Sequence, residues 1–152
     1  APMAAPRPPR FRELERAEID EILSRNHVGR IAFSFRDRVD IEPIHYVYDD
    51  GWIYGRTQPG TKLTVIRHNY WVAFEVDEID DFFQWRSVVV RGGFYIIPEP
   101  SRGTPKDDEV RERAIELLRR LIPDALTPED PTPGRTTLFR IAVQEVEGRA
   151  AE

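Results

Sequence analysis

The sequence predicts a mainly β protein in which six antiparallel strands form a small barrel with helices packed outside. Six segments carry strand signals, mostly apolar residues that recur with a period of two. Most of the links between them are short, and short links mean antiparallel pairing. Three further segments have the helical period. The chain has 152 residues, which fits one domain better than two.

The first helix is predicted from Glu13 to Arg25, where Leu14, Ala17 and Ile22 form one apolar stripe. The period then changes to two in His27–Phe35, which predicts the first strand. Arg36-Asp37-Arg38 can turn the chain back into a second strand.

The second strand is predicted over Val39–Tyr48, and its alternation slips by one residue at Pro43. Proline cannot donate to a strand ladder, so we expect a bulge or an edge position there. Asp49-Asp50-Gly51 is a hairpin turn signal. Trp52–Thr57 is predicted as the third strand.

The second half of the chain predicts two helices and three strands. Gly92-Gly93 predicts a bend in the fifth strand, and Pro123–Gly134 predicts a Pro-rich loop. Acids begin the last helix and arginines end it, which suits the helix dipole. The predicted segments are a short helix at Thr61–Asn69, strands at Tyr70–Asp80 and Trp85–Pro98, a helix at Lys106–Ile122 and a strand at Thr136–Gly148.

Composition bounds the class of protein. The net charge of -5 argues against non-specific DNA binding, which needs a basic surface. The absence of cysteine excludes disulfides, thiolate metal sites and cysteine nucleophiles. No run approaches the roughly 18 apolar residues of a membrane span. We therefore expect no nucleic-acid partner, no membrane and a cytoplasmic location.

The stretch GRTQPGTK, Gly55–Lys62, has two glycines at the spacing of a phosphate-binding P-loop. Thr61 precedes Lys62, however, and the preceding strand follows a hairpin rather than a parallel βαβ unit. A nucleoside triphosphate site is therefore not predicted. A phosphate site remains open, because the loop combines cations and hydroxyls (Arg56, Thr57, Thr61 and Lys62) before a helix N-terminus. The alternative is a solvated turn with a capping threonine.

Other chemistry finds little support in the sequence. His27, His45 and His68 lie in different elements without ligand spacing, which disfavours a metal site. We expect His68 to be a surface residue near a helix end. His45 is of interest because it follows the irregularity at Pro43. No serine stands in a nucleophile elbow.

The order of these pieces resembles the pyridoxamine 5'-phosphate oxidase-like family of FMN-binding split barrels, and most closely its nitroimidazole-resistance branch. The resemblance covers Ile19 to Arg149. It rests on GRIAF (29–33), PIHYVY (43–48), YGRTQPGTKLTVIRHNYWVAFEV (54–76), WRSVVVRG (85–92) and FRIAVQEVEGR (139–149). It implies a split-barrel flavin-binding domain at 12–149, between a flexible arm at 1–11 and a tail at 150–152.

The resemblance also implies a homodimer with FMN in a groove between the subunits. Arg56, Thr57, Thr61 and Lys62 would hold the phosphate. The flavin ring and ribityl chain would lie along Pro43, Ile44, His45 and Tyr46, and Trp85 and Ser87 would approach the ring. Physical chemistry agrees, because the phosphate meets cations and the ring meets aromatic and β-branched strand residues.

The function expected from this resemblance is an oxidoreductase that transfers electrons or hydride from a reduced nicotinamide to a small acceptor. His45 is the candidate proton donor or substrate contact. The C-terminal EVEGRAAE lacks the Arg- and His-containing motif of the vitamin B6 oxidases, which argues against that activity. The alternatives are a deazaflavin F420 or haem cofactor, with His45 as the haem ligand, or a non-enzymatic dimer that stores or senses a ligand.

Overall fold

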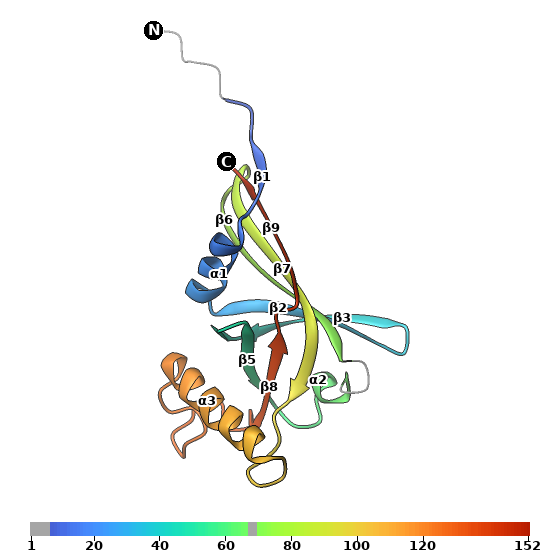
Figure 1. The fold of residues 1–152 in the computed structure, drawn as a ribbon, viewed down its shortest axis with the longest axis vertical. Helices are drawn as coiled ribbons and strands as arrows, with labels where there is room; N and C mark the ends of the chain where they lie inside the picture. The colour runs from blue at the N-terminus through green and yellow to red at the C-terminus, as the bar shows by residue number, and fades with distance from the viewer. Residues whose placement is uncertain (1–6, 67–69) are drawn as a thin grey trace.

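Nine strands in one sheet and three helices make up the part of the chain that the structure, a computed structural model, describes: residues 7–66 and 70–152 (Figure 1). The strands are β1 (Phe11–Glu13), β2 (Val28–Phe35), β3 (Arg38–His45), β4 (Val47–Asp49), β5 (Trp52–Thr57), β6 (Trp71–Asp81), β7 (Gln84–Ile96), β8 (Thr137–Ala142) and β9 (Glu145–Ala151). The helices are α1 (Arg16–Arg25), α2 (Lys62–Val65) and α3 (Pro105–Leu121).

The sheet curls into a barrel that does not close. Its main path runs β3-β2-β6-β7-β8-β5-β4, with every pairing antiparallel. The two ends of this path, β3 and β4, follow each other in the chain at Tyr46 but do not pair with each other. The predicted antiparallel split barrel is therefore confirmed, and the split lies between β3 and the β4–β5 hairpin.

The strand β7 joins the two parts of the sheet because it changes partner half-way along. Trp85 to Arg91 pair with β9, whereas Phe94 to Ile96 pair with β8. The predicted bend at Gly92-Gly93 lies at this change. A Cβ atom at Gly92 would stand 1.7 Å from the carbonyl oxygen of Ala142, so only glycine fits where the strands diverge.

The strand count exceeds the predicted six because two predicted strands are each divided and one strand was not foreseen. Val39–Tyr48 is interrupted at Tyr46, and Thr136–Gly148 is interrupted between β8 and β9. Pro43 pairs with Arg30 in an unshifted register, so the predicted bulge is absent. The alternative expectation, an edge position, is confirmed because β3 ends the sheet.

The sheet also includes residues at both ends of the chain that lie outside the predicted domain, 12–149. The strand β1 pairs with the end of β9, and the pair Phe11 and Ala151 lies beyond both expected boundaries. Arg10 and Glu152 then exchange two backbone hydrogen bonds of 3.0 and 2.9 Å. Ala150 and Ala151 are buried, so two of the three residues of the expected tail belong to β9.

Two hydrophobic cores result from this arrangement. In the larger core, α1 buries Ile19, Ile22 and Leu23 against the inside of the barrel. In the smaller core, α3 packs Ala114, Leu117 and Leu118 against β4, β5 and β8. Thr104 and Asp107 form a capping box that fixes the start of α3. In the described residues, no helix is both long and apolar enough to span a membrane.

The helix predicted at Thr61–Asn69 is much shorter in the structure, where α2 covers only Lys62–Val65. The last three predicted positions, which include His68, lie outside the described residues. A single turn of helix has little dipole to offer an anion. The phosphate binding expected at the start of this helix must therefore rest on side chains.

Candidate functional site

A pocket of about 370 Å³ lies in the split of the barrel, where the end of β3 faces the end of β5. We call it the split pocket. Six of the ten predicted site residues line it: Pro43, Ile44, His45, Arg56, Thr57 and Thr61. Its remaining wall consists of Val28, Glu42, Gln58, Leu63 and Arg135. The volume falls in the range of about 300–1,000 Å³ that is typical of small-molecule sites.

The backbone of β3 forms one rim of the split pocket. Among the described strands, β3 pairs only with β2, so the other side of its backbone has no strand partner. An edge strand presents N–H and C=O groups to whatever lies beside it. A polar, planar ligand in the split pocket can therefore form hydrogen bonds with the backbone of β3 as well as with side chains.

Arg56 has a role that differs from the one expected for it. Its Nη1 donates to Asp130 Oδ2 and to the Arg135 carbonyl (3.4 Å). Its Nη2 donates to Asp130 Oδ1 (3.0 Å) and to Thr132 Oγ1 (2.9 Å). The four terminal N–H bonds of the guanidinium thus point at four acceptors in the loop after α3. Arg56 is primarily a clamp for that loop.

Asp130 completes this clamp from the loop side. The Arg56 and Asp130 side chains are 6% and 2% exposed, so the ion pair is buried. Asp130 also accepts hydrogen bonds from the backbone N–H groups of Leu126 (2.8 Å) and Thr132 (2.9 Å). Arg56, and after it these N–H groups, hold the pKa of the Asp130 carboxyl well below its ordinary value. The carboxylate is therefore ionised and fully engaged.

The threonine pair of the loop before α2 is arranged as a donor set. Thr57 Oγ1 and Thr61 Oγ1 lie 3.3 Å apart in the wall of the split pocket. Thr61 precedes α2, but its hydroxyl does not cap that helix. Both hydroxyls can turn toward an acceptor in the pocket.

Two of the predicted residues beside this site lie outside the pocket wall. Lys62 Nζ pairs with Asp40 Oδ1 at 3.1 Å on the exposed surface. Tyr46 is fully buried, and its hydroxyl donates to the Leu23 carbonyl at 2.8 Å. Its ring meets Phe74 edge-on at 4.9 Å, and burial raises the pKa of its hydroxyl. Within this chain, Tyr46 is a core residue that anchors the break between β3 and β4.

Trp85 and Ser87 lie on the same sheet face as Pro43 and His45, but on β7. The order β3-β2-β6-β7 separates them from β3 by three strand spacings, about 14 Å at the usual 4.8 Å per strand. Trp85 packs near Phe11, with ring centroids 6.3 Å apart. A single chain thus does not bring these two residues to the split pocket.

Ser87 instead belongs to an acidic cluster on this outer face. Its hydroxyl donates to Glu75 Oε2 at 3.5 Å, and Asp77 stands opposite Ser87 in the ladder. Arg30 lies 3.6 Å from Glu75 and 3.8 Å from Asp77. Burial and the neighbouring Asp77 carboxyl raise the pKa of Glu75 to about 7, because one arginine does not offset two acids.

Arg135 is the residue of the pocket wall that sequence reasoning missed most completely. It follows a Pro-rich loop and belongs to no motif. Its place follows from the pairing of β5 with β8, in which Thr57 stands opposite Thr137. Two residues before Thr137, the chain therefore passes beside Gln58, and Gly134 packs against the Gln58 amide.

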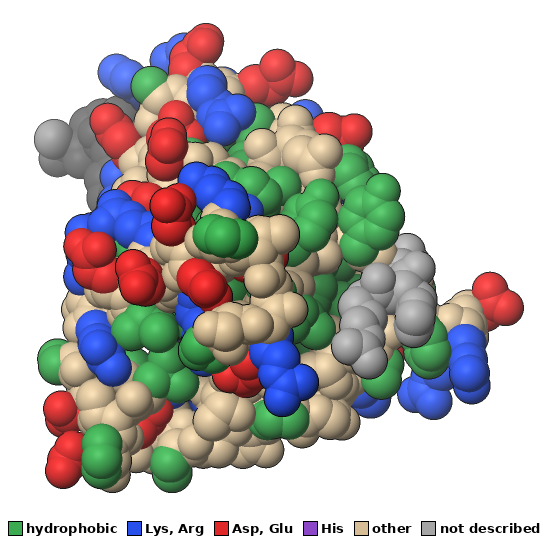
Figure 2. Space-filling model, turned by 60° about the horizontal axis from the view of Figure 1, so that its bottom comes forward, with side chains coloured by type: hydrophobic (Ala, Val, Ile, Leu, Met, Phe, Trp, Pro, Cys, Tyr) green, Lys and Arg blue, Asp and Glu red, His purple; other side chains and the backbone are tan. Residues whose placement is uncertain are grey.

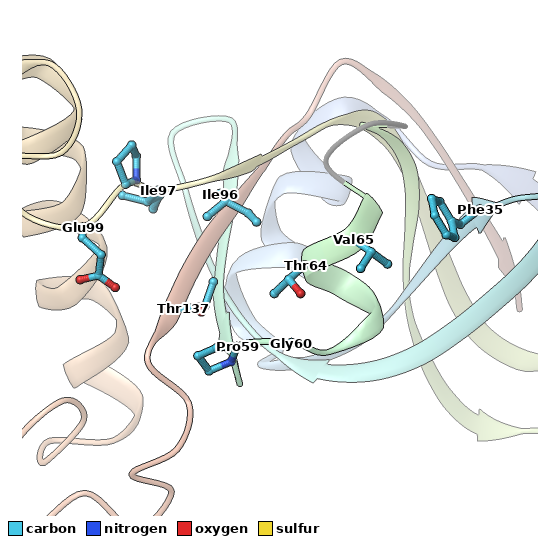
Figure 3. Close-up of a pocket in the computed structure, with 10 residues that line it drawn as sticks. Phe35, Pro59, Gly60, Thr64, Val65, Ile96, Ile97, Glu99 and Thr137 are labelled. Atoms are coloured by element: carbon cyan, nitrogen blue, oxygen red, sulfur yellow. The ribbon is translucent and has the colours of Figure 1, made fainter.

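A second, larger cavity of about 540 Å³ lies on the other side of the loop at Pro59 and Gly60 (Figure 3). Figure 3 shows Val65 on α2, Phe35 on β2 and Ile96 on β7 around it, with Glu99 at its far end. Its wall is mostly apolar, and Thr64 Oγ1 is already bonded to the Thr61 carbonyl. This cavity suits apolar surface, whereas the split pocket carries the polar groups.

Comparison with known proteins places the chain in a family. The family described as pyridoxamine 5'-phosphate oxidase matches residues 15–150. The chain belongs to this family. An uncharacterized protein of Rhizobium meliloti is 30% identical over 147 residues, which are 92% of this chain and 95% of that protein.

Solved structures of similar proteins share the fold. An FAD-binding protein from Mesorhizobium loti is 28% identical with a TM-score of 0.74, over 95% of this chain and 99% of that one. A candidate 5-nitroimidazole antibiotic resistance protein from Bacteroides thetaiotaomicron has a TM-score of 0.70 at 14% identity, over 95% and 90% of the two chains. The second likeness concerns the fold alone. The family match confirms the predicted family, and the two solved structures confirm the predicted split barrel.

Proposed function

We propose that this chain is a flavin-dependent oxidoreductase that binds FMN in the split pocket and acts as a homodimer. It would pass electrons or hydride from a reduced nicotinamide to a small acceptor. The observation that carries the proposal is the convergence of six predicted cofactor residues, from β3, β5 and the following loop, on one pocket. Residues 43–45 are at least 11 positions from Arg56, Thr57 and Thr61 in the sequence, so the fold is needed to bring the two groups together.

The residues of the split pocket fit the parts of a flavin nucleotide. Val28, Ile44 and Leu63 offer an apolar wall for a planar ring, beside the unpaired backbone edge of β3. Thr57 and Thr61, in the same pocket wall, offer hydroxyl donors for a phosphate. A bound flavin supplies the redox chemistry, and the protein positions it and sets its electrostatic surroundings.

His45 is the side chain best placed to handle a proton. It stands at the exposed end of β3, opposite Val28, and lines the split pocket. Histidine is the side chain that most often transfers protons in enzyme active sites, and both of its ring nitrogens can take part in hydrogen bonds. We assign His45 the role of proton donor or substrate contact.

A second copy of the chain would complete the site. The outer face of β3 carries Val39 and Ile41, which are 79% and 66% exposed, in line with Pro43 and His45. Exposed apolar side chains in a row on one sheet face are typical of an interface. Trp85 and Ser87 lie on this same face, so a partner copy seated there could bring its own pair to the split pocket.

The FAD-binding relative supports a variant of the proposal in which FAD replaces FMN. FAD contains the whole FMN unit, so the contacts in the split pocket would be the same. Its adenylate would need further room, and the apolar cavity is lined by Pro59 and Gly60 of the same loop that contributes Gln58 and Thr61 to the split pocket. The deazaflavin, haem and non-enzymatic alternatives receive no specific support from the site.

The test is to purify the chain and identify what it binds. A two-banded yellow spectrum is expected, and chromatography of the cofactor released by denaturation distinguishes FMN from FAD. A single violet-region band would indicate deazaflavin, and a Soret band would indicate haem. A colourless protein that also fails to bind added FMN and FAD would end the proposal. Light scattering on the loaded protein tests the dimer.

A further inference from the structure

We propose that Arg135 is the cation that binds the flavin phosphate, and that the Arg56–Asp130 clamp positions it. The inference rests on the proposed function and assigns the anion-binding role to a residue outside the predicted set. Arg56 and Lys62 were the expected cations. The contacts in the structure direct both of them elsewhere.

Arg56 has too few free donors to serve as the main phosphate ligand. Its two terminal nitrogens use all four N–H bonds on Asp130, Thr132 and the Arg135 carbonyl. To bind a phosphate, Arg56 would have to abandon a buried carboxylate, which strongly opposes the exchange. The net charge of the clamp is zero, so it adds little attraction for a dianion.

Lys62 is also directed away from the split pocket. Its ammonium pairs with Asp40, and Lys62 is absent from the pocket wall. Of the lysine and arginine side chains that the structure places in that wall, Arg135 alone carries an uncompensated charge. Within residues 7–66 and 70–152 its side chain has neither a hydrogen bond nor an ion pair, although it is half-buried.

Hydrogen bonds from the clamp and its loop fix the backbone position of Arg135, and with it the point from which its side chain extends. The Arg135 carbonyl accepts from Arg56, and the Arg135 N–H donates to the Thr132 carbonyl at 3.1 Å. Thr132 in turn accepts from Arg56 through its hydroxyl. Both peptide groups of Arg135 are therefore hydrogen-bonded, two residues before Thr137, which pairs with Thr57 at the end of β5.

The resulting donor set suits a phosphate monoester. A guanidinium presents a planar fork of N–H groups that matches two phosphate oxygens, and hydroxyls can satisfy the third. Arg135, Thr57 and Thr61 all line the split pocket, the two threonine hydroxyls lie 3.3 Å apart, and Arg135 is two residues before Thr137, the strand partner of Thr57. Glu42 is the acid of this wall and comes from β3 on the opposite rim.

The experiment compares the binding of FMN with that of riboflavin, which differs only by the phosphate. Fluorescence quenching on the full chain measures both dissociation constants for the wild type, Arg135→Ala and Arg135→Lys. The control is Arg102→Ala, an exposed loop arginine outside the pocket. Arg135→Ala should weaken FMN roughly 10- to 100-fold, the value of a charge-assisted contact, and riboflavin less than twofold. Arg135→Lys should recover part of the loss.

A double-mutant cycle tests the positioning role of the clamp. If Arg56 acts through Arg135, Arg56→Lys weakens FMN in the wild type but adds little in the Arg135→Ala background. Additive losses would mean that Arg56 touches the phosphate itself and would overturn the positioning role. Circular dichroism checks that each variant is folded.

The outcomes separate this inference from the function on which it depends. A wild type that binds both flavins, with an FMN preference that survives Arg135→Ala, overturns the role of Arg135 and leaves the proposed function standing. A wild type that binds neither FMN, FAD nor riboflavin overturns both. Loss of the FMN preference in Arg135→Ala, but not in Arg102→Ala, supports the inference.

Discussion

Two carboxyl sites in this molecule have opposite electrostatics. Below the split pocket, Asp130 is enclosed by Arg56 and two backbone N–H groups, and its pKa is lowered. On the outer face of β6, Glu75 shares one arginine with Asp77, and its pKa is raised to about 7. The complete set of partners around Asp130 indicates a structural role for that carboxylate. An incomplete set marks a surface where charge remains uncompensated.

The two sites also respond to pH in opposite directions. The contribution of Asp130 to the free energy of unfolding is present above its ordinary pKa of 3.8 and is lost as the pH falls toward the lowered folded value. The contribution of Glu75 is present below its ordinary pKa of 4.5 and is lost as the pH rises to about 7. Acid therefore weakens the clamp, and neutral pH weakens the outer face.

The largest effect is expected from Arg56→Met, which removes the cation and leaves a buried carboxylate without its main partner. Because an orphaned buried charge is strongly destabilising, Tm should fall on the order of 10 °C. Thermal unfolding at pH 7 measures this, with Arg102→Met as the exposed control. A change in Tm no larger than that of the control would mean that the clamp does not hold the loop.

The outer face is tested next by Ile41→Asp, which places a charge among exposed apolar side chains. If a second copy covers this face, the variant should be a monomer at concentrations where the wild type is a dimer. Light scattering gives the mass. Phe82→Asp, at the exposed tip between β6 and β7, is the matched control and should leave the dimer intact. An unchanged mass for Ile41→Asp would place the interface elsewhere.

A smaller, pH-specific effect is expected from Glu75→Gln. In the wild type, the folded protein retains a proton on Glu75 that the unfolded chain releases between pH 4.5 and about 7. Wild-type Tm should therefore decline across this interval relative to the variant, with no such divergence between pH 7.5 and 9. Parallel Tm profiles for the two proteins would show that Glu75 titrates normally.

The smallest effect is expected from Thr132→Val, which removes one of the four acceptors of Arg56 and keeps the shape of the side chain. The loss of a single hydrogen bond to a charged group that keeps its other partners should lower Tm by about 2–4 °C. A decrease as large as that of Arg56→Met would indicate that the hydroxyl, rather than the ion pair, organises the loop.

The sequence was informative wherever the signal was local. The alternation of Ile31, Phe33 and Phe35, the turn at Gly51 and the bend at Gly92-Gly93 each predicted what the structure contains. The strand β1 was missed because Phe11–Glu13 has no alternation of its own and is ordered by pairing with residues 149–151. A strand that depends on pairing with residues more than 100 positions away cannot be recognised from a short stretch of sequence.

The site was predicted only as far as its parts are contiguous. Pro43, Ile44 and His45 were found through the family resemblance of one strand, and Arg56, Thr57 and Thr61 because they stand close together where a strand runs into a loop. The role of Arg56 depends on Asp130, which is 74 residues away, and therefore no local pattern could separate a clamp from a ligand. Arg135 becomes visible only once β5 is known to pair with β8.

The close approach of Gly92 to the Ala142 backbone also limits which substitutions this chain can accept during evolution. The backbone angle of Gly51 (φ of 81°) favours glycine, but a side chain there would meet no atom within 4 Å. Asparagine or aspartate, which tolerate positive φ better than other side chains, could therefore replace it. At Gly92 the obstacle is the Ala142 carbonyl, which belongs to the backbone and cannot rotate aside. We therefore expect substitutions to be accepted at Gly51 and only glycine to be accepted at Gly92.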